Sequence, residues 1–199
     1  AREVLAAHPG APIIGDVKCS QVMFDEIDRM GGQGVMWKTG HSLVKAKMAE
    51  LNSPLAGELS GHIFFADKYY GYDDALYCAV RLINALAGIS GGLSSLTKDL
   101  PVLHSTAEVR FTVDEAVKFD LVPKIADNIK ALNDPDNQIS EIDGLRVTTP
   151  DGWWLLRPSN TQDVLVARAE SNSAEGLERL TQTAIQEVEK IGYKLDFSS

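Results

Sequence analysis

The first hundred residues carry short apolar runs that alternate with amphipathic segments. Apolar runs at residues 11–17, 34–38 and 63–66 predict buried strands. The segments between and after these runs repeat apolar residues at helical spacing, which predicts helices at residues 20–30, 41–51 and 74–88. Strands that alternate with helices predict an α/β domain in which helices cover a mainly parallel sheet.

The pattern changes after Pro101. Alternating residues at 107–113 indicate a half-exposed strand, and further strands are predicted at 144–149, 153–157 and 163–169. The turn Pro150-Asp151-Gly152 joins two of them, since Asp-Gly is a strong hairpin signal. With helices predicted at 117–132 and 174–191, this half is expected to be an α+β domain on an antiparallel sheet flanked by helices. The polar stretch at 88–101 separates the halves, so we predict domains at 1–100 and 101–199.

A short polar loop, Arg157-Pro158-Ser159-Asn160-Thr161, lies between two predicted strands of the second domain. An arginine fork, two hydroxyls, an amide and loop N–H groups together suit a tetrahedral oxyanion such as phosphate. The loop therefore indicates an anion cradle. A strand-connecting turn of the same composition is the alternative interpretation.

A second loop, Gly57-Glu58-Leu59-Ser60-Gly61-His62, leads into the predicted strand at 63–66. A carboxylate and a hydroxyl can bind adjacent sugar hydroxyls as acceptor and donor, while glycines let a ligand approach the backbone. This composition predicts a sugar-binding loop. The alternative is a simple turn with a surface histidine.

Two strand-to-helix junctions present titratable side chains. Lys18 follows the first predicted strand and His41 follows the second, so both are expected at the carboxyl edge of one parallel sheet. Taken singly, Lys18 could be a solvated cation at a helix start and His41 a residue like an N-cap. The adjacent Asp73 and Asp74 precede a helix and are interpreted as capping carboxylates rather than metal ligands.

Composition limits the class of partner. The chain has 28 acidic and 19 basic residues and a net charge of −9, which argues against nucleic acid or an anionic membrane surface. The two cysteines, Cys19 and Cys78, lack metal-site spacing and are interpreted as reduced thiols of a cytoplasmic protein. The sequence has no apolar run of transmembrane length, no signal-peptide pattern and no initiator Met, so we expect a piece of a longer chain.

Four segments, in this order and spacing, resemble the α-D-phosphohexomutase superfamily, and most of all its bacterial phosphomannomutase/phosphoglucomutase branch. They are Asp16-Val17-Lys18-Cys19, Lys38-Thr39-Gly40-His41-Ser42, Gly57-Glu58-Leu59-Ser60-Gly61-His62 and Arg157-Pro158-Ser159-Asn160-Thr161. Leu59 stands where Met is more common. The resemblance implies the third and fourth of four domains, the last with a TATA-box-binding-protein-like fold. The family's phosphoserine and magnesium loops belong to the first two domains, and neither motif occurs in this sequence.

The resemblance also implies an activity and residue roles. A phosphoserine would donate its phosphoryl group to a glucose or mannose 1- or 6-phosphate, through a bisphosphorylated sugar that reorients. Glu58 and Ser60 would bind the sugar O3 and O4 hydroxyls, and Lys18, His41 and His62 would line the reacting centre as catalytic electrostatic or acid–base groups. The non-reacting phosphate would be bound by Arg157, Ser159, Asn160 and Thr161.

Cofactor and partners follow from the same resemblance. Mg²⁺ is expected in the full-length enzyme with ligands outside this chain, and no metal is expected on this chain. The expected partners are hexose 1-phosphate, hexose 6-phosphate, hexose 1,6-bisphosphate and the missing N-terminal domains of a cytoplasmic monomer. The chain alone is expected to lack transfer activity. A free-standing, non-catalytic sugar-phosphate-binding module is the alternative, and a purely structural domain pair is a more remote one.

Overall fold

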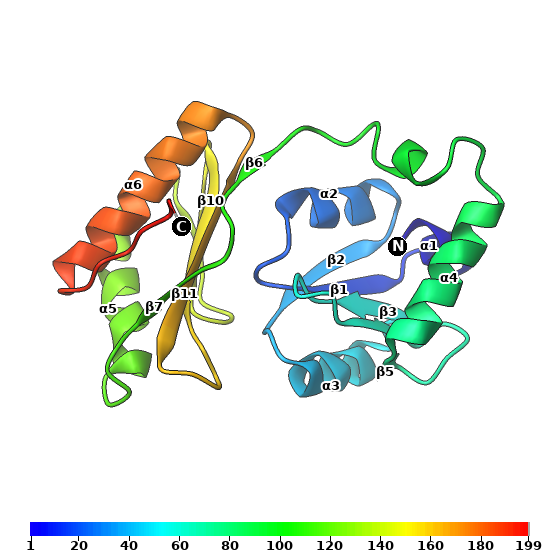
Figure 1. The fold of residues 1–199 in the computed structure, drawn as a ribbon, viewed down its shortest axis with the longest axis horizontal. Coiled ribbons are helices and arrows are strands. Elements are labelled where there is room, and N and C mark those ends of the chain that lie inside the picture. Colours follow the sequence, from blue (N-terminus) through cyan, green and yellow to red (C-terminus); the bar gives the residue numbers. More distant parts are fainter. Residues whose placement is uncertain (199) are drawn as a thin grey trace. The chain divides into compact units, whose positions relative to one another are not determined.

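The computed structural model describes residues 1–198, which form two compact units (Figure 1). The first unit spans Ala1–Pro101 and the second begins at Val102. The division falls at the end of the polar stretch that the sequence marks as a boundary. Each unit has its own sheet, with two hydrophobic cores in the first unit and one in the second.

The sheet of the first unit has the strand order β2-β1-β3-β4-β5. Its strands are β1 (Pro12–Asp16), β2 (Gln33–Trp37), β3 (Leu55–Gly57), β4 (Ile63–Phe65) and β5 (Tyr72–Asp73). The central strand β1 pairs in parallel with both β2 and β3, whereas the pairs β3–β4 and β4–β5 are antiparallel. The predicted α/β class is confirmed, and the sheet is mixed.

Two short strands of this sheet, β3 and β5, were not predicted, and the direction of β4 differs from the prediction. The third parallel strand is the short β3, and the predicted strand at 63–66 runs antiparallel to it as β4. The reason is the length of the connection. Parallel neighbours need a crossover of a dozen or more residues, whereas the loop between Gly57 and Ile63 is long enough only for a hairpin.

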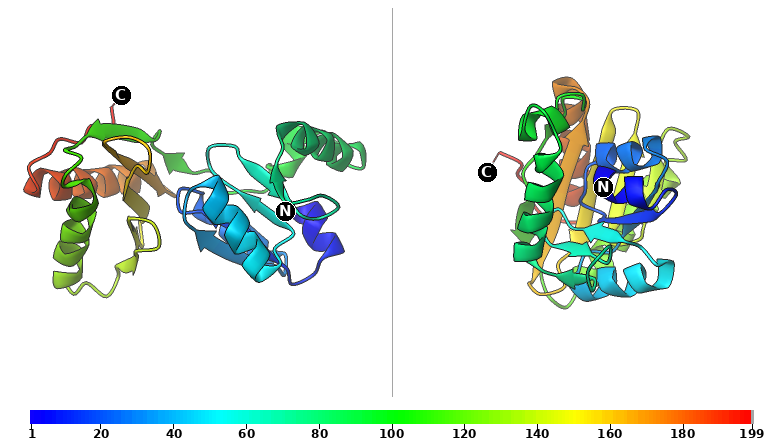
Figure 2. Two further views of the ribbon diagram at one scale, coloured as in Figure 1. Left: turned by 90° about the horizontal axis from the view of Figure 1, so that it is seen from below. Right: turned by 90° about the vertical axis from the view of Figure 1, so that its right-hand side faces the viewer.

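Helices cover both faces of this sheet (Figures 1 and 2). The helices are α1 (Arg2–Ala7), α2 (Gln21–Arg29), α3 (His41–Leu51) and α4 (Ala75–Ala87), followed by a 3₁₀ turn at Leu93–Leu96. One core joins α1 and α2 to the strands through Val4, Ile13 and Ile27. The other core joins α3 through Val44 and Phe64. Successive residues of β1 therefore point to opposite cores: Ile13 packs with α1 and α2, and Ile14 packs with α3, as expected for a strand in a sheet covered on both faces.

A buried ion pair anchors α4 to the rest of the first unit. Nη2 of Arg81 donates to Oδ2 of Asp67 at 2.7 Å and pairs with Oε1 of Glu3 at 3.1 Å. His8 shares the same carboxylate, with its Nε2 2.9 Å from Oδ1 of Asp67. Burial raises the pKa of Asp67, but hydrogen bonds from His8 and Arg81 outweigh it and bring the pKa below its ordinary value.

The second unit is an antiparallel sheet with the strand order β6-β11-β10-β9-β8, and β7 also pairs with β11. The strands are β6 (His104–Ser105), β7 (Val109–Thr112), β8 (Gln138–Ser140), β9 (Leu145–Thr149), β10 (Gly152–Pro158) and β11 (Val164–Ser171). Helices α5 (Lys118–Ala131) and α6 (Ala174–Lys190) pack on one face, where Ile125 and Val188 meet Trp154 and Leu165. The predicted antiparallel sheet with helices is confirmed.

The predicted hairpin joins β9 to β10. Gly152 pairs with Thr149, which leaves a two-residue turn, and Gly152 has φ +136°. A Cβ at this glycine would lie 2.1 Å from the carbonyl oxygen of Glu170, so glycine is required there. The alternation along β10 then sends Trp154 to the helices and Trp153 and Arg157 to the other face.

On that other face, Trp153 lies against two arginines. The guanidinium carbons of Arg146 and Arg168 are 3.8 Å and 5.4 Å from its ring centroid, and its indole nitrogen donates to Glu170 at 3.0 Å. Both tryptophans are buried, as the strand pattern indicates. Among the described residues, no helix combines the length and apolar character needed to cross a bilayer.

Candidate functional site

Three loops of the first unit meet at one edge of its sheet. Because β1 pairs in parallel with β2 and β3, their carboxyl ends lie together. Lys18 follows β1, His41 opens α3 after β2, and the loop of Glu58 and Ser60 follows β3. The structure therefore brings Lys18, His41 and the predicted sugar-binding loop to the same edge, as the strand order requires.

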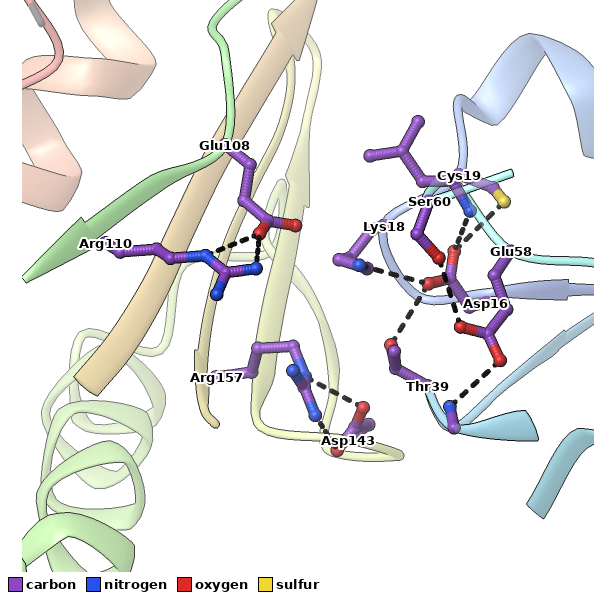
Figure 3. Close-up of polar contacts among 12 residues, drawn as sticks. Asp16, Lys18, Cys19, Thr39, Glu58, Ser60, Glu108, Arg110, Asp143 and Arg157 are labelled. Atoms are coloured by element: carbon purple, nitrogen blue, oxygen red, sulfur yellow. Dashed lines mark hydrogen bonds and ion pairs between the residues drawn. The ribbon is translucent and has the colours of Figure 1, made fainter. Parts of the chain in front are cut away.

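Asp16, the last residue of β1, connects all three loops (Figure 3). Its carboxylate is 0 % exposed. Oδ2 accepts from the hydroxyl of Thr39 at 3.1 Å and lies 3.7 Å from Nζ of Lys18. Oδ1 accepts from the backbone N–H of Leu59 at 3.2 Å and from the thiol of Cys19 at 3.1 Å. One buried charge thus fixes the three loops relative to one another.

The carboxylate of Glu58 has two polar neighbours. Oε1 accepts from the backbone N–H of Gly40 at 3.2 Å, and Oε2 accepts from the hydroxyl of Ser60 at 3.3 Å. The backbone N–H of Glu58 donates to the carbonyl oxygen of His62 at 2.8 Å, which closes the loop. Glu58 is buried and Ser60 is exposed. A ligand at this loop would therefore meet an oriented carboxylate acceptor beside an exposed hydroxyl, whose proton would have to turn from Glu58 to the ligand.

His62 is held by a second carboxylate. Its Nδ1 lies 2.6 Å from Oδ2 of Asp73, and an ionised carboxylate can only accept, so Nδ1 is the donor. The interpretation of Asp73 as a cap is wrong, because Asp74 alone caps α4, accepting from the N–H of Tyr77 at 2.9 Å. The pairing leaves Nε2 of His62 as the nitrogen that can act on a ligand.

In the second unit, Arg157 near the end of β10 is paired with Asp143. Nε of Arg157 donates to Oδ2 of Asp143 at 2.9 Å, and Nη2 lies 3.5 Å from Oδ1 (Figure 3). Gly144 allows this close approach. It has φ +85°, and a Cβ there would lie 2.6 Å from Cβ of Arg157. The pair holds the guanidinium in a defined orientation before any anion binds.

The rest of the predicted cradle is the turn after β10. The hydroxyl oxygen of Ser159 accepts from the N–H groups of Thr161 at 3.3 Å and Gln162 at 3.2 Å, which fixes the turn. Ser159 is buried, whereas the side chains of Asn160 and Thr161 are exposed. The four predicted residues are thus neighbours on one short loop, and two of them present their polar groups to solvent.

Three of these carboxylates received no site role from the sequence. Asp16, Asp73 and Asp143 each orient another candidate residue: Lys18, His62 and Arg157, respectively. Asp73 and Asp143 lie 11 and 14 residues from their partners, and Asp16 also binds the distant Thr39 and Leu59. Only the position of Asp16 at the strand end, two residues before Lys18, could have signalled it. Within residues 1–198, no group of three or more His, Cys, Asp or Glu side chains could hold a metal ion, so these residues do not fit a metal site.

Comparison with known proteins identifies the class. The family model described as phosphoglucomutase/phosphomannomutase, alpha/beta/alpha domain III, matches residues 1–103, and the model for the C-terminal domain matches residues 108–187. The chain therefore belongs to the phosphoglucomutase/phosphomannomutase family. It corresponds to the C-terminal part of the bacterial enzymes.

Particular relatives agree with this assignment. The phosphomannomutase/phosphoglucomutase of Pseudomonas syringae pv. tomato is 40% identical over 196 residues, which are 98% of this chain and 42% of that protein. The Pseudomonas aeruginosa protein is 42% identical over 90% of this chain and 38% of its own length. The crystal structure of a family member from Burkholderia thailandensis has a TM-score of 0.87 at 42% identity and covers 98% of this chain. The chain thus spans about two fifths of these relatives.

Proposed function

We propose that this chain is the substrate-recognition half of a hexose-phosphate mutase that interconverts the 1- and 6-phosphates of glucose or mannose. The observation that carries the proposal is the oriented carboxylate–hydroxyl pair of Glu58 and Ser60 at the edge where Asp16 joins three loops. The names of the bacterial relatives, phosphomannomutase/phosphoglucomutase, support it. The full-length enzyme would pass through a bisphosphorylated sugar.

The sugar would be bound through vicinal hydroxyls. Glu58 accepts from one hydroxyl while Ser60 donates to its neighbour, which matches O3 and O4 of a hexose. Glucose and mannose differ only at C2, so contacts confined to O3 and O4 accept both. This proposal accounts for a dual glucose and mannose specificity without a second pocket.

The phosphate would be bound by the loop of the second unit. Arg157 supplies paired N–H donors, while Ser159, Asn160 and Thr161 add two hydroxyls and an amide. At the reacting phosphate, Lys18 would supply positive charge, His41 would donate a hydrogen bond from the start of α3, and Nε2 of His62 would accept or return a hydroxyl proton. These roles are electrostatic and positional, as phosphoryl transfer requires.

The transferable phosphoryl group and the metal would come from elsewhere in the longer polypeptide. The Aspergillus fumigatus N-acetylphosphoglucosamine mutase, a neighbour at 16% identity, is known in complex with GlcNAc-6P and magnesium. Because the described residues do not fit a metal site, we propose that the Mg²⁺ ligands lie in earlier domains of the longer polypeptide. The phosphoserine is proposed to lie there too, since the family's phosphoserine motif does not occur in this sequence. The longer protein is proposed to act as a monomer.

Two measurements test the proposal. In a coupled assay with glucose 1-phosphate and glucose 1,6-bisphosphate, the 199-residue chain should show no turnover, whereas the longer polypeptide should be active. Calorimetric titration of the chain with glucose 1,6-bisphosphate should detect binding that Glu58→Gln weakens and that the surface control Glu26→Gln does not. Turnover by the isolated chain, or binding that is indifferent to Glu58→Gln, would refute it.

The alternative of a free-standing binding module makes a different prediction. The reading frame would then encode no family domains ahead of this region, and sugar-phosphate binding would occur without any mutase activity in the intact gene product. Sequencing that reading frame, together with the intact mass of the expressed protein, distinguishes the two functions.

A further inference from the structure

Helix α4 presents apolar side chains to solvent. Leu76, Val80 and Ile83 are 82%, 62% and 68% exposed, and they recur at intervals of four and three residues, which places them along one side of the helix. Leu82 is also exposed, and the basic residue Arg81 is buried. This is the reverse of the pattern of a surface helix, whose apolar stripe faces the core.

The helix is fixed in this orientation. Arg81 makes hydrogen bonds at 2.7 Å to the carboxylate and at 2.9 Å to the carbonyl oxygen of Asp67, and its guanidinium lies 4.4 Å from the ring centroid of Phe65. Rotating α4 to bury Ile83 would break the pairs of Arg81 with Asp67 and Glu3. The apolar stripe therefore has no means of being buried within its own unit.

We infer that α4 is the surface on which the domain preceding family domain III packs in the longer polypeptide. The chain covers 38–42% of its bacterial relatives and matches the models of domain III and the C-terminal domain, so further family domains precede this region in those relatives. The inference rests on family membership and not on the sugar-phosphate role of the site loops.

The position of α1 favours this occupant over a second copy of the chain. Glu3 in α1 pairs with Arg81 of α4 at 3.1 Å, so the amino end of domain III lies beside α4 (Figure 1). Polypeptide that leads into α1 therefore enters beside α4, on the side of the buried Arg81, and a domain that it carries is tethered close to this helix. A covalently connected domain meets such a surface at an effective concentration on the order of millimolar, which a separate molecule does not match at ordinary protein concentrations.

The test compares one substitution in two lengths of polypeptide. Ile83→Gln keeps a helix-favouring residue and removes the apolar group. In the longer polypeptide it should lower the melting temperature by about 5 °C or more, and in the 199-residue chain it should shift it by no more than about 1 °C. Leu132→Gln is the matched control, since Leu132 is 63% exposed at the end of α5, and it should have little effect in either length.

A milder variant covers the case in which the longer Ile83→Gln protein does not fold. Val80→Thr keeps the branched shape of the side chain and adds one hydroxyl, so it should give a smaller shift in the same direction, again only in the longer polypeptide. Equal shifts in both lengths, or none in either, would overturn the inference. A concentration-dependent dimer of the 199-residue chain in light scattering, abolished by Ile83→Gln, would instead assign the stripe to self-association. Loss of mutase activity alone bears on the proposed function and not on this surface.

Discussion

Replacement of Asp16 should destabilise the first unit far more than replacement of a surface carboxylate. In Asp16→Ala, Lys18 loses the carboxylate oxygen that lies 3.7 Å from its Nζ, and the N–H of Leu59 and the hydroxyl of Thr39 each lose a hydrogen bond to that carboxylate. Removing one partner of a buried charge pair costs about 3–5 kcal/mol, because the other charge stays buried. Asp16 is 0 % exposed and Lys18 is 6 % exposed, so solvent screening does not reduce this figure much.

The destabilisation expected for Asp16→Ala is large compared with the free energy of unfolding of a whole domain. Domain stabilities are about 5–15 kcal/mol, so Asp16→Ala removes a major fraction. At about 4 °C per kcal/mol for a domain of this size, the low end of the estimate corresponds to a fall of about 12 °C in melting temperature. Asp16→Asn keeps the shape and one acceptor oxygen but loses the charge, so about half of that fall is expected.

Differential scanning calorimetry of the 199-residue chain is the assay, because it separates the melting of one unit from that of the other. Glu26→Gln is the control, since Glu26 pairs with Arg29 on the surface of the same unit. The reasoning would be refuted if the first unit of Asp16→Ala had the same melting temperature as that of Glu26→Gln. An Asp16→Asn protein as stable as the unsubstituted chain would show that the charge of Asp16 is not what holds the loops.

Three further outcomes are expected. Nitrogen-detected NMR of the neutral His62 imidazole should show the Nδ1–H tautomer, and Asp73→Asn should abolish that preference; an unchanged tautomer would exclude this carboxylate as its cause. Arg157→Lys should weaken glucose 1,6-bisphosphate binding roughly tenfold in calorimetry, because lysine does not reproduce the guanidinium fork, and equal affinities would remove Arg157 from the phosphate site. The stability that Asp67 contributes should be present above its unfolded pKa of about 3.9 and lost as the pH falls through its lower folded value; urea midpoints between about pH 6 and pH 2.5 should fall less in Asp67→Asn, and parallel curves would contradict the assignment.

The sequence predicted the elements whose pattern is long and regular. Helix α3 and the strands β1, β9 and β10 appear within a residue or two of their predicted bounds, because their apolar spacing is unbroken. Strand β3 escaped prediction, since its three residues, Leu55–Gly57, are too few to show a period. The direction of β4 depends on its pairing with β3. Because β3 was not predicted, the antiparallel direction of β4 could not be predicted either.

The same limit applies to the site. Lys18, Glu58 and Arg157 could be proposed from residue type and position, because cations and carboxylates in strand-end loops favour ligand contacts. The carboxylates that orient candidate site residues could not be predicted in this way. The pairing of Asp143 with Arg157, like that of Asp16 with Leu59, arises only when the strands are in register. Asp73 and Asp74 are chemically identical neighbours, and the fold alone gives one to His62 and the other to α4.

Position 59 shows how such a site can change its sequence without changing its structure. Leu59 makes its bond to Asp16 through the main-chain N–H, while its side chain is 41% exposed. Every amino acid except proline carries that N–H, so the bond to Asp16 does not depend on which of them stands at position 59. The position between Glu58 and Ser60 is therefore open to engineering. A cysteine placed there could carry a fluorophore at the loop of Glu58 and Ser60 while the anchoring bond to Asp16 is kept.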